Sequence, residues 1–255
     1  MRIATWNVNS IRRRQDAVLA WAELQRIDVL LLQETKVTDE HFPRDAFETA
    51  GWQLAISGEP QRNGVAILAR TPIAEVERGL DGEADDTQAR WIEATVEGVR
   101  VASVYVPNGT EVGSDKFAYK LRFFERLGAR LDRALAEETP FVVGGDYNVA
   151  PEPIDVCDPV GWEGGICFHI DERRAWRRLV NRGFTDAFRA VEPTTRAYSF
   201  WEHKGAAFRT DEGMRIDHHL LSPGVADRLL GCGIDRTPRG EKDASDHAPV
   251  WLEIG

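Results

Sequence analysis

Residues 141–151 read FVVGGDYNVAP, and the rest of the chain is organised around this stretch. Its apolar run ends at two glycines and is followed at once by Asp146 and Asn148, a pattern typical of a buried strand that ends at a site. Side chains alternate between the faces of a strand, so we expect Asp146 and Asn148 to point the same way. Hydrolysis needs such a pair, because one group takes a proton and another donates a hydrogen bond to developing charge. A strand followed by an ordinary Asx turn explains the same residues.

The composition describes a globular chain with room for a sizeable core. It has 255 residues, of which 42% are hydrophobic, and no linker, repeat or low-complexity tract, so we expect one domain over residues 1–255. No apolar run reaches the roughly 18 residues that cross a membrane. The basic cluster near the start follows the apolar segment, the reverse of a secretory signal. The three cysteines indicate reduced thiols, and we therefore expect a cytoplasmic protein.

The charge balance is acidic. A net charge of −10 and a pI of about 5.2 argue against a non-specific polyanion binder. An enzyme of nucleic acids is still allowed, because phosphate affinity depends on a local basic face and an acidic metal site adds negative charge of its own.

Strand patterns outnumber helix patterns. Besides the strand from residue 141, we expect strands at residues 2–6, 28–32, 52–56, 64–69, 91–96, 99–106 and 214–221. Helices are expected at 11–26, 116–138 and 171–182, and loops at 79–90 and 151–170. Ser10 is placed to cap the first helix, whose first turn holds three arginines that are either solvated or meet an anion. The sequence therefore predicts an α/β fold in which two sheets pack face to face with helices outside.

Acids and amides recur where the predicted strands end. The set is Asn7, Glu34, Asp146 with Asn148, Asp217, and Asp246 with His247. Apart from one imidazole these are hard oxygen donors, which suit Mg²⁺ or Mn²⁺ rather than zinc. The sequence contains no zinc-type cysteine or histidine motif, no P-loop, no dinucleotide glycine fingerprint and no Gly-x-Ser-x-Gly elbow. It gives no support to P-loop nucleotide hydrolysis or to serine hydrolysis.

Six motifs in order carry a family resemblance. They are TWNVNSIR near the start, DVLLLQETK at 28–36, YVPNG at 105–109, GGDYNVAP at 144–151, MRIDHHLLS at 214–222 and SDHAPVW at 245–251. Together they resemble the exonuclease III family of abasic-site endonucleases, within the endonuclease/exonuclease/phosphatase superfamily of deoxyribonuclease I-like proteins. The resemblance implies a four-layer α/β sandwich, with two mixed β-sheets face to face and helices outside.

The resemblance also implies an activity. We expect a divalent-metal-dependent DNA repair phosphodiesterase of the exodeoxyribonuclease III or AP endonuclease type. It would cleave double-stranded DNA 5′ to abasic sites, degrade strands from the 3′ end and clean blocked 3′ ends. The expected cofactor is Mg²⁺, with Mn²⁺ as a substitute, and the expected state is a monomer.

The resemblance assigns metal ligands. Glu34 is the expected main ligand, with Asn7 and Asp246 close by. Some descriptions of the family place a second metal among Asp146, Asn148 and His247, and the sequence leaves one metal and two metals both open.

Catalytic roles follow from the same resemblance. Asp146 is expected to orient or deprotonate the attacking water, and Asn148 to hydrogen-bond to phosphate oxygens. His247 is expected to contact the scissile phosphate while Asp217 fixes its orientation, and Tyr105 to assist the leaving group. A carboxylate beside His247 raises the pKa of the imidazole and keeps it protonated near pH 7.

An apolar pocket for a base-less sugar is expected from Phe200, Trp201, Met214 and Ile216. Such a pocket excludes a normal nucleotide by its size. Core packing is the alternative for Phe200 and Trp201.

Two other functions remain open on the sequence. One is a superfamily phosphatase that acts on a non-DNA phosphoester such as an inositol phosphate, and the other is a catalytically silent DNA-binding relative. The arginine-bearing, aromatic segment at 198–215 favours DNA over the first of these.

Overall fold

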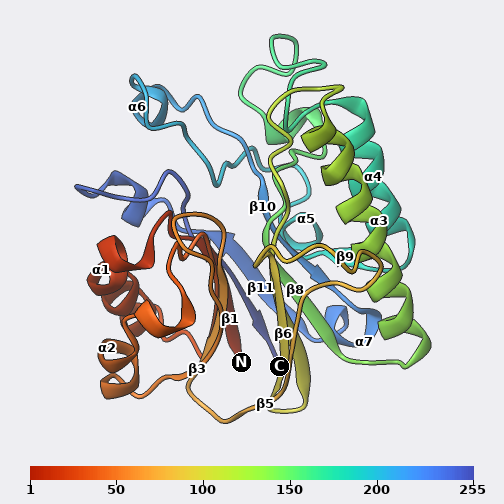
Figure 1. Cartoon of the computed structure of the whole chain (residues 1–255). Coiled ribbons are helices and arrows are strands. Elements are labelled where there is room, and N and C mark those ends of the chain that lie inside the picture. The colour runs from red at the N-terminus through yellow and green to blue at the C-terminus, as the bar shows by residue number, and fades with distance from the viewer.

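The computed structural model describes residues 1–255 and contains two six-stranded sheets that face each other (Figure 1). The strand order is β11-β12-β1-β2-β4-β3 in the first sheet and β5-β6-β7-β8-β10-β9 in the second. In each sheet one central pair is parallel: β1 (Arg2–Asn7) with β2 (Val29–Gln33), and β7 (Val99–Tyr105) with β8 (Phe141–Asp146). The neighbouring pairs are antiparallel, so both sheets are mixed, as expected.

The remaining elements complete these layers. The other strands of the first sheet are β3 (Gln53–Ser57), β4 (Val65–Ala69), β11 (Leu229–Ile234) and β12 (Val250–Ile254). Those of the second are β5 (Ile73–Arg78), β6 (Trp91–Val96), β9 (Thr185–Asp186) and β10 (Asp217–Leu221). The helices are α1 (Ile11–Leu24), α2 (Arg44–Thr49), α3 (Asp115–Ala136), α4 (Ile170–Asn181), α5 (Ala187–Val191), α6 (Ala207–Thr210) and α7 (Pro223–Ala226). Single 3₁₀ turns are η1 (Asp39–His41), η2 (Pro153–Asp155) and η3 (Thr237–Gly240).

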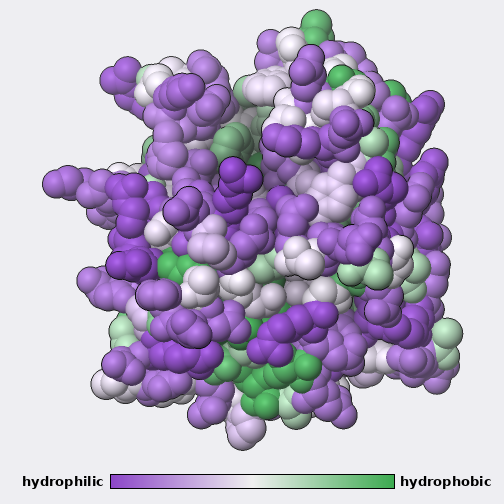
Figure 2. Space-filling model, viewed as in Figure 1, coloured by the Kyte–Doolittle hydropathy of each residue, from purple (hydrophilic) through white to green (hydrophobic).

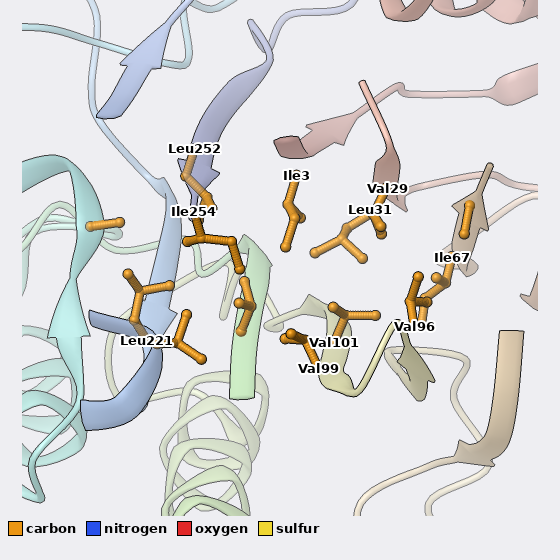
Figure 3. Packing of buried hydrophobic residues seen from close by; sticks show 14 of the residues in the cluster. Ile3, Val29, Leu31, Ile67, Val96, Val99, Val101, Leu221, Leu252 and Ile254 are labelled. Carbon is orange, nitrogen blue, oxygen red and sulfur yellow. The ribbon is translucent and has the colours of Figure 1, made fainter. Parts of the chain in front are cut away.

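Apolar side chains alternate between two layers of core. Leu31 of β2 points between the sheets, where Ile3, Val101 and Leu252 also lie (Figure 3). Its neighbours Leu30 and Leu32 point to the opposite face of the same strand. Both faces of β2 are thus buried, which explains why its sequence is a continuous apolar run instead of an alternating one.

Helices cover the outer face of each sheet. Val18 and Trp21 of α1 pack on the first sheet, and Phe124 and Leu127 of α3, with Trp176 of α4, pack on the second. Figure 1 shows α1 and α2 on one side of the paired sheets and α3 and α4 on the other. The result is the four-layer α/β sandwich that the sequence predicts.

The paired glycines of the opening stretch serve packing. A Cβ at Gly144 would lie 2.7 Å from Leu31 Cδ1 of the facing sheet, and one at Gly145 would lie 1.9 Å from the carbonyl oxygen of Val104. Neither glycine has a positive φ angle. They therefore permit close approach of the neighbouring backbone and of the facing sheet.

The sequence analysis missed several elements, namely β5, β9, β11, β12, α2, α5, α6 and α7, and three of them show why. The edge strand β5 is largely exposed, with only Ile73 and Val76 half-buried, so it lacks the buried alternation that identifies a strand. The strand β11 contains two glycines and an exposed leucine, and α2 spans only 6 residues. Each of these elements is held by its neighbours more than by its own pattern.

The start of α1 also differs from the prediction. Ser10 has a φ of 96° and its side chain makes no capping hydrogen bond. Of the three arginines in the first turn, Arg14 is buried, and its guanidinium donates to the carbonyl oxygens of Val8 at 3.1 Å and Ala244 at 2.9 Å. Arg14 therefore ties the helix to the segment before β12 and is neither solvated nor free to meet an anion.

The face seen in Figure 2 is mostly hydrophilic, with hydrophobic side chains gathered at the edge near the two chain ends. None of the helices combines the length and the apolar character that a bilayer crossing requires.

The core between the sheets gives a stability prediction. We expect Leu31→Ala to lower the free energy of unfolding by about 2–5 kcal/mol, because it opens a cavity at a fully buried position. Leu24→Ala is the control, since that side chain is 77% exposed and should change stability by less than about 0.5 kcal/mol. Urea unfolding followed by tryptophan fluorescence measures both, and equal effects of the two substitutions would contradict the packing described.

Candidate active site

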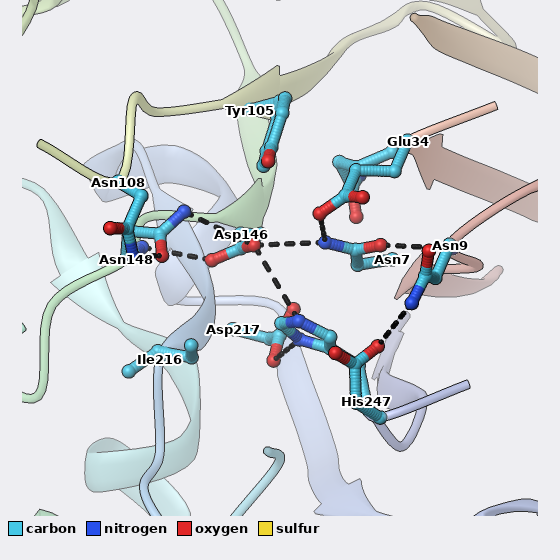
Figure 4. A network of polar contacts seen from close by, with 12 residues as sticks. Asn7, Asn9, Glu34, Tyr105, Asn108, Asp146, Asn148, Ile216, Asp217 and His247 are labelled. Carbon is cyan, nitrogen blue, oxygen red and sulfur yellow. Dashed lines mark hydrogen bonds and ion pairs between the residues drawn. The ribbon is translucent and has the colours of Figure 1, made fainter. Parts of the chain in front are cut away.

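Strands from both sheets end at one edge of the sandwich. The parallel pairing of β1 with β2 sets Asn7 beside Gln33. Glu34 follows Gln33 in the chain, so Asn7 and Glu34 leave the sheet at the same edge. In the second sheet Asp146 pairs with Tyr105 of β7 and with Asp217 of β10. Figure 4 shows these side chains pointing toward one another across the edge.

Glu34, Asp146 and His247 form the centre of the site. One functional atom from each lies within 4.8 Å of the others, although the three residues are far apart in the sequence. The amide nitrogen of Asn7 donates to Glu34 Oε1 at 2.8 Å and to Asp146 Oδ2 at 2.9 Å, which bridges the two carboxylates. His247 Nε2 lies 3.8 Å from Asp146 Oδ2.

The imidazole of His247 is fixed from behind. Its Nδ1 donates to Asp217 Oδ2 at 2.8 Å, and Ser199 Oγ donates to the same oxygen at 2.6 Å. Burial alone lowers the pKa of His247, but the carboxylates of Asp217 and Asp146 outweigh it and raise the pKa to about 10. At neutral pH the site therefore contains an imidazolium whose Nε2–H faces Asp146.

The two central carboxyl groups have opposite pKa shifts. Burial raises the pKa of Asp146, and the positive charge of His247 only partly offsets this. Burial also pushes the pKa of Glu34 upward, but hydrogen bonds from Asn7 and Lys36 outweigh it and leave the pKa below its usual value. Glu34 is thus a fixed anion, while Asp146 can exchange a proton, a division of roles typical of hydrolytic sites.

Asn148 reaches Asp146 through a turn and not along a strand. The strand β8 ends at Asp146, and Asn148 has a φ of 50°. Its backbone N–H donates to Asp146 Oδ1 at 2.9 Å, and its side-chain nitrogen lies 3.3 Å from Asp146 Oδ2. The strand and the Asx turn are both present, and the prediction that alternation along one strand aligns the two side chains is wrong.

Tyr105 borders the same space. Burial raises the pKa of its hydroxyl well above the usual value, and the nearby charge of Glu34 raises it further. The guanidinium carbon of Arg90 lies 4.8 Å from the ring centre. The phenol therefore stays protonated across the neutral range and is available as a proton donor.

The predicted ligand set is only partly brought together. Glu34, Asp146 and His247 meet, and two carboxylates in a partly enclosed site have the donor chemistry that a divalent cation such as Mg²⁺ or Mn²⁺ prefers. Asn7 presents its nitrogen to the carboxylates, so here it acts as a hydrogen-bond donor and not as an oxygen ligand. Asp246 lies outside the group and accepts from Asn9 at 3.0 Å.

The predicted pocket residues divide into two groups. Met214 and Ile216 are nearly buried in a small apolar cluster, against which Phe200 is partly buried, and the Phe200 ring centre lies 4.9 Å from that of His247. Trp201 is fully buried in a separate cluster with Tyr198, and its Nε1 donates to Asp211 Oδ1 at 3.1 Å. Of the two alternatives for Trp201, the structure favours core packing, because no surface of the side chain is open to a ligand.

Four residues at the site were missed. Lys36 Nζ lies 2.7 Å from Glu34 Oε2 and donates to Asn9 Oδ1 at 2.6 Å. Asn108 Nδ2 donates to Asn148 Oδ1 at 3.0 Å, and Ser199 holds Asp217. Asn9, Lys36 and Asn108 each lie two or three residues after a strand end, and that position could have identified them, whereas Ser199 carries no such signal.

Comparison with known proteins places the chain in a family. The sequence profile of the family described as "Endonuclease/Exonuclease/phosphatase family" matches residues 4–247. Exodeoxyribonuclease III of Haemophilus influenzae is 32% identical over 268 aligned residues that cover 100% of both chains. An AP endonuclease structure from Archaeoglobus fulgidus is 39% identical with a TM-score of 0.96, covering 100% of this chain and 99% of that one. The 3′ phosphatase NExo from Neisseria, bound to a product DNA hairpin, is 38% identical with a TM-score of 0.98 at the same coverage.

The chain therefore belongs to the endonuclease/exonuclease/phosphatase family. Its similarity to exodeoxyribonuclease III and AP endonuclease relatives extends along their full length. This confirms the resemblance predicted from the six motifs, the deoxyribonuclease I-like sandwich, and the prediction of a nuclease-type hydrolase.

The Asp217–His247 contact gives a pH prediction. The pKa of His247 is raised from its usual value of about 6.5 to about 10, so its ionic contacts stabilise the fold fully below pH 6.5 and are lost as pH rises through 10. Asp217→Asn should lower the pKa of His247, since it removes the strongest attractive charge. NMR titration of the imidazole in metal-free protein measures this. Asp81→Asn, at a carboxylate that is 88% exposed, is the control and should leave the titration unchanged, and an equal pKa in all three proteins would refute the contact.

Proposed function

We propose that this protein is a DNA repair phosphodiesterase that cleaves double-stranded DNA 5′ to abasic sites and also removes nucleotides and blocking groups from 3′ ends. The observation that carries the proposal is the convergence of Glu34, Asp146 and His247 within 4.8 Å at the edge of the sandwich. A fixed anion, a proton acceptor and an imidazolium are the groups that hydrolysis of a phosphodiester requires. The relatives named as exodeoxyribonuclease III and AP endonuclease support DNA as the substrate.

The reaction divides among the side chains as follows. Asp146 accepts a proton from the attacking water, because burial raises its pKa toward the working range. The imidazolium of His247 neutralises charge that develops on the phosphate, and Asp217 keeps it oriented and protonated. Asn148 donates to a phosphate oxygen, and Tyr105 supplies a proton to the departing oxygen.

Glu34 is the proposed anchor of a divalent cation, Mg²⁺ or Mn²⁺, with Asp146 and His247 beside it. Such an ion polarises the phosphoryl oxygen as a Lewis acid when it is bound. Asn7 and Asp246 join the ligand set only if their side chains turn from the hydrogen bonds that they make with Glu34 and Asn9.

The apolar cluster beside His247 supports abasic DNA as the preferred lesion. The accessible apolar surface here is the half-buried ring of Phe200, which lies against the imidazole, while Met214 and Ile216 are buried and pack behind it. A sugar without its base presents an apolar face of small size to such a surface, whereas a normal nucleotide adds a polar base.

We further propose that residues 1–255 act as one domain, as a monomer, in the cytoplasm.

Cleavage of a defined duplex tests the function. A duplex with one tetrahydrofuran abasic analogue should be cut 5′ to the lesion in the presence of Mg²⁺ and leave a 3′-hydroxyl, and EDTA should abolish cleavage. Turnover of an inositol phosphate without cleavage of the duplex would identify a phosphatase instead. Binding of the duplex without turnover of either substrate would identify a silent relative.

Asp217→Asn is the sharpest kinetic prediction. It should lower kcat by ~100-fold or more, because both the orientation and the charge of His247 depend on that carboxylate. Single-turnover cleavage of the abasic duplex gives the rate, with Asp81→Asn as the control that keeps the wild-type rate. An unchanged rate for Asp217→Asn would remove this residue from the mechanism.

A further inference from the structure

A buried ion pair joins α3 to α4 directly behind Asn148. The side chains of Lys120 and Glu172 are both 0% exposed, and Lys120 Nζ donates to Glu172 Oε1. A buried ion pair is a weak source of stability, because the cost of removing two charges from water offsets most of their attraction. What the pair holds in place is therefore the more informative feature.

Lys120 uses all three of its donors. Besides Glu172, Nζ donates to the backbone carbonyl oxygen of Asn108 at 3.1 Å and to that of Asn148 at 2.6 Å. Asn108 follows β7 and Asn148 follows β8, the two strands that end beside the site. One side chain from α3 thus fixes both loops that border Asp146.

The side-chain amide of Asn148 depends on this backbone. Its Oδ1 accepts from Asn108 Nδ2 at 3.0 Å, and its Nδ2 donates to Val106 O at 3.0 Å and lies 3.3 Å from Asp146 Oδ2. The φ of 50° at Asn148 lies in the left-handed region, which asparagine adopts more readily than most residues other than glycine. Lys120 binds the carbonyl oxygen of that same residue.

Glu172 completes the arrangement from α4. Its Oε1 accepts from the backbone N–H of Cys167 at 3.2 Å, and its Oε2 accepts from that of His169 at 2.9 Å. Two carbonyl oxygens that follow that of Asn148 in the chain have other partners. His218 Nε2 donates to Val149 O at 2.8 Å, and Arg173 Nε donates to Pro151 O at 2.9 Å. The contact with the Asn148 carbonyl is therefore particular to Lys120.

We propose that Lys120, supported by Glu172, is a positioning residue for Asn148. It touches no substrate, and it acts through the Asn148 carbonyl to aim the side-chain amide at Asp146 and at the phosphate. The expected effect on rate rests on the proposed function, whereas the effect on the geometry of Asn148 does not.

The test removes the ammonium without leaving a buried carboxylate unpaired, which would endanger folding. Lys120→Met keeps most of the side-chain volume, and Glu172→Gln keeps an acceptor for the loop N–H groups. In the double variant K120M/E172Q, we expect kcat on the abasic duplex to fall about 10–100-fold, because small misplacement of a reacting group carries costs of this size. KM should change by less than about twofold, since no group that contacts DNA is removed.

The matched control is R126M/D86N. Arg126 and Asp86 also form an ion pair from α3, with side chains 9% and 7% exposed, and neither contacts Asn148. This control should retain the wild-type kcat, which separates positioning from a general loosening of α3.

The second readout is independent of activity. The ¹H–¹⁵N NMR signal of the Asn148 side-chain amide should shift in K120M/E172Q and stay in place in R126M/D86N. A folded K120M/E172Q protein with wild-type kcat and an unmoved Asn148 signal would overturn the proposal. If the double variant does not fold, K120L/E172Q, which also leaves the Asn148 carbonyl oxygen without a charged donor, replaces it, and an unmoved Asn148 signal there has the same meaning. If the wild-type protein cleaves no abasic duplex, the proposed function is wrong. The NMR comparison still tests whether Lys120 positions the Asn148 side-chain amide.

Discussion

Burial of strands β2 and β8 on both faces is the constraint on which the site depends. Leu31 and Val142 point between the sheets while their neighbours Leu32 and Val143 point to the helices, so a slip of either strand by one residue would move each side chain into the other core layer, where the close packing does not fit it. Gly144 lets Leu31 approach from the facing sheet. With both registers fixed, Glu34 and Asp146 must emerge at the same edge.

That edge concentrates negative charge, and the fold compensates it locally. The imidazolium of His247 faces Asp146, Lys36 pairs with Glu34, and the Asn7 amide bridges the two acids. Glu34, Lys36 and Asn148 all have φ angles between 50° and 56°, in the left-handed region. A left-handed backbone conformation costs free energy at a residue such as Glu34 or Lys36, and the surrounding sandwich supplies the stability that tolerates it.

Buried ionic groups brace the chain after Asp146 from two sides. On one side Lys120 holds the Asn148 carbonyl. On the other, Arg215 binds Asp155 and Asp186 through its guanidinium and also contacts His218 Nδ1 at 2.8 Å. Arg215 precedes Asp217 by two residues, so the same network steadies the strand that orients His247. These groups position the chain after Asp146 more than they raise the free energy of unfolding, since replacing a buried ion pair by apolar residues often leaves stability unchanged.

The central strands, the long helices and the strand-end residues of the site could be predicted from the amino-acid sequence, because apolar periodicity and the position of a polar residue after a strand are local properties. It missed β5 and β11, which have little burial of their own, and it did not predict that the Asn7 amide nitrogen donates to two carboxylates or that Trp201 is fully buried. Two features depend on the three-dimensional packing alone: which atom of an amide faces a carboxylate, and the position of Lys120 behind the site. Such contacts join residues up to 237 positions apart, and their geometry is set by the packing of whole layers, which no local pattern records.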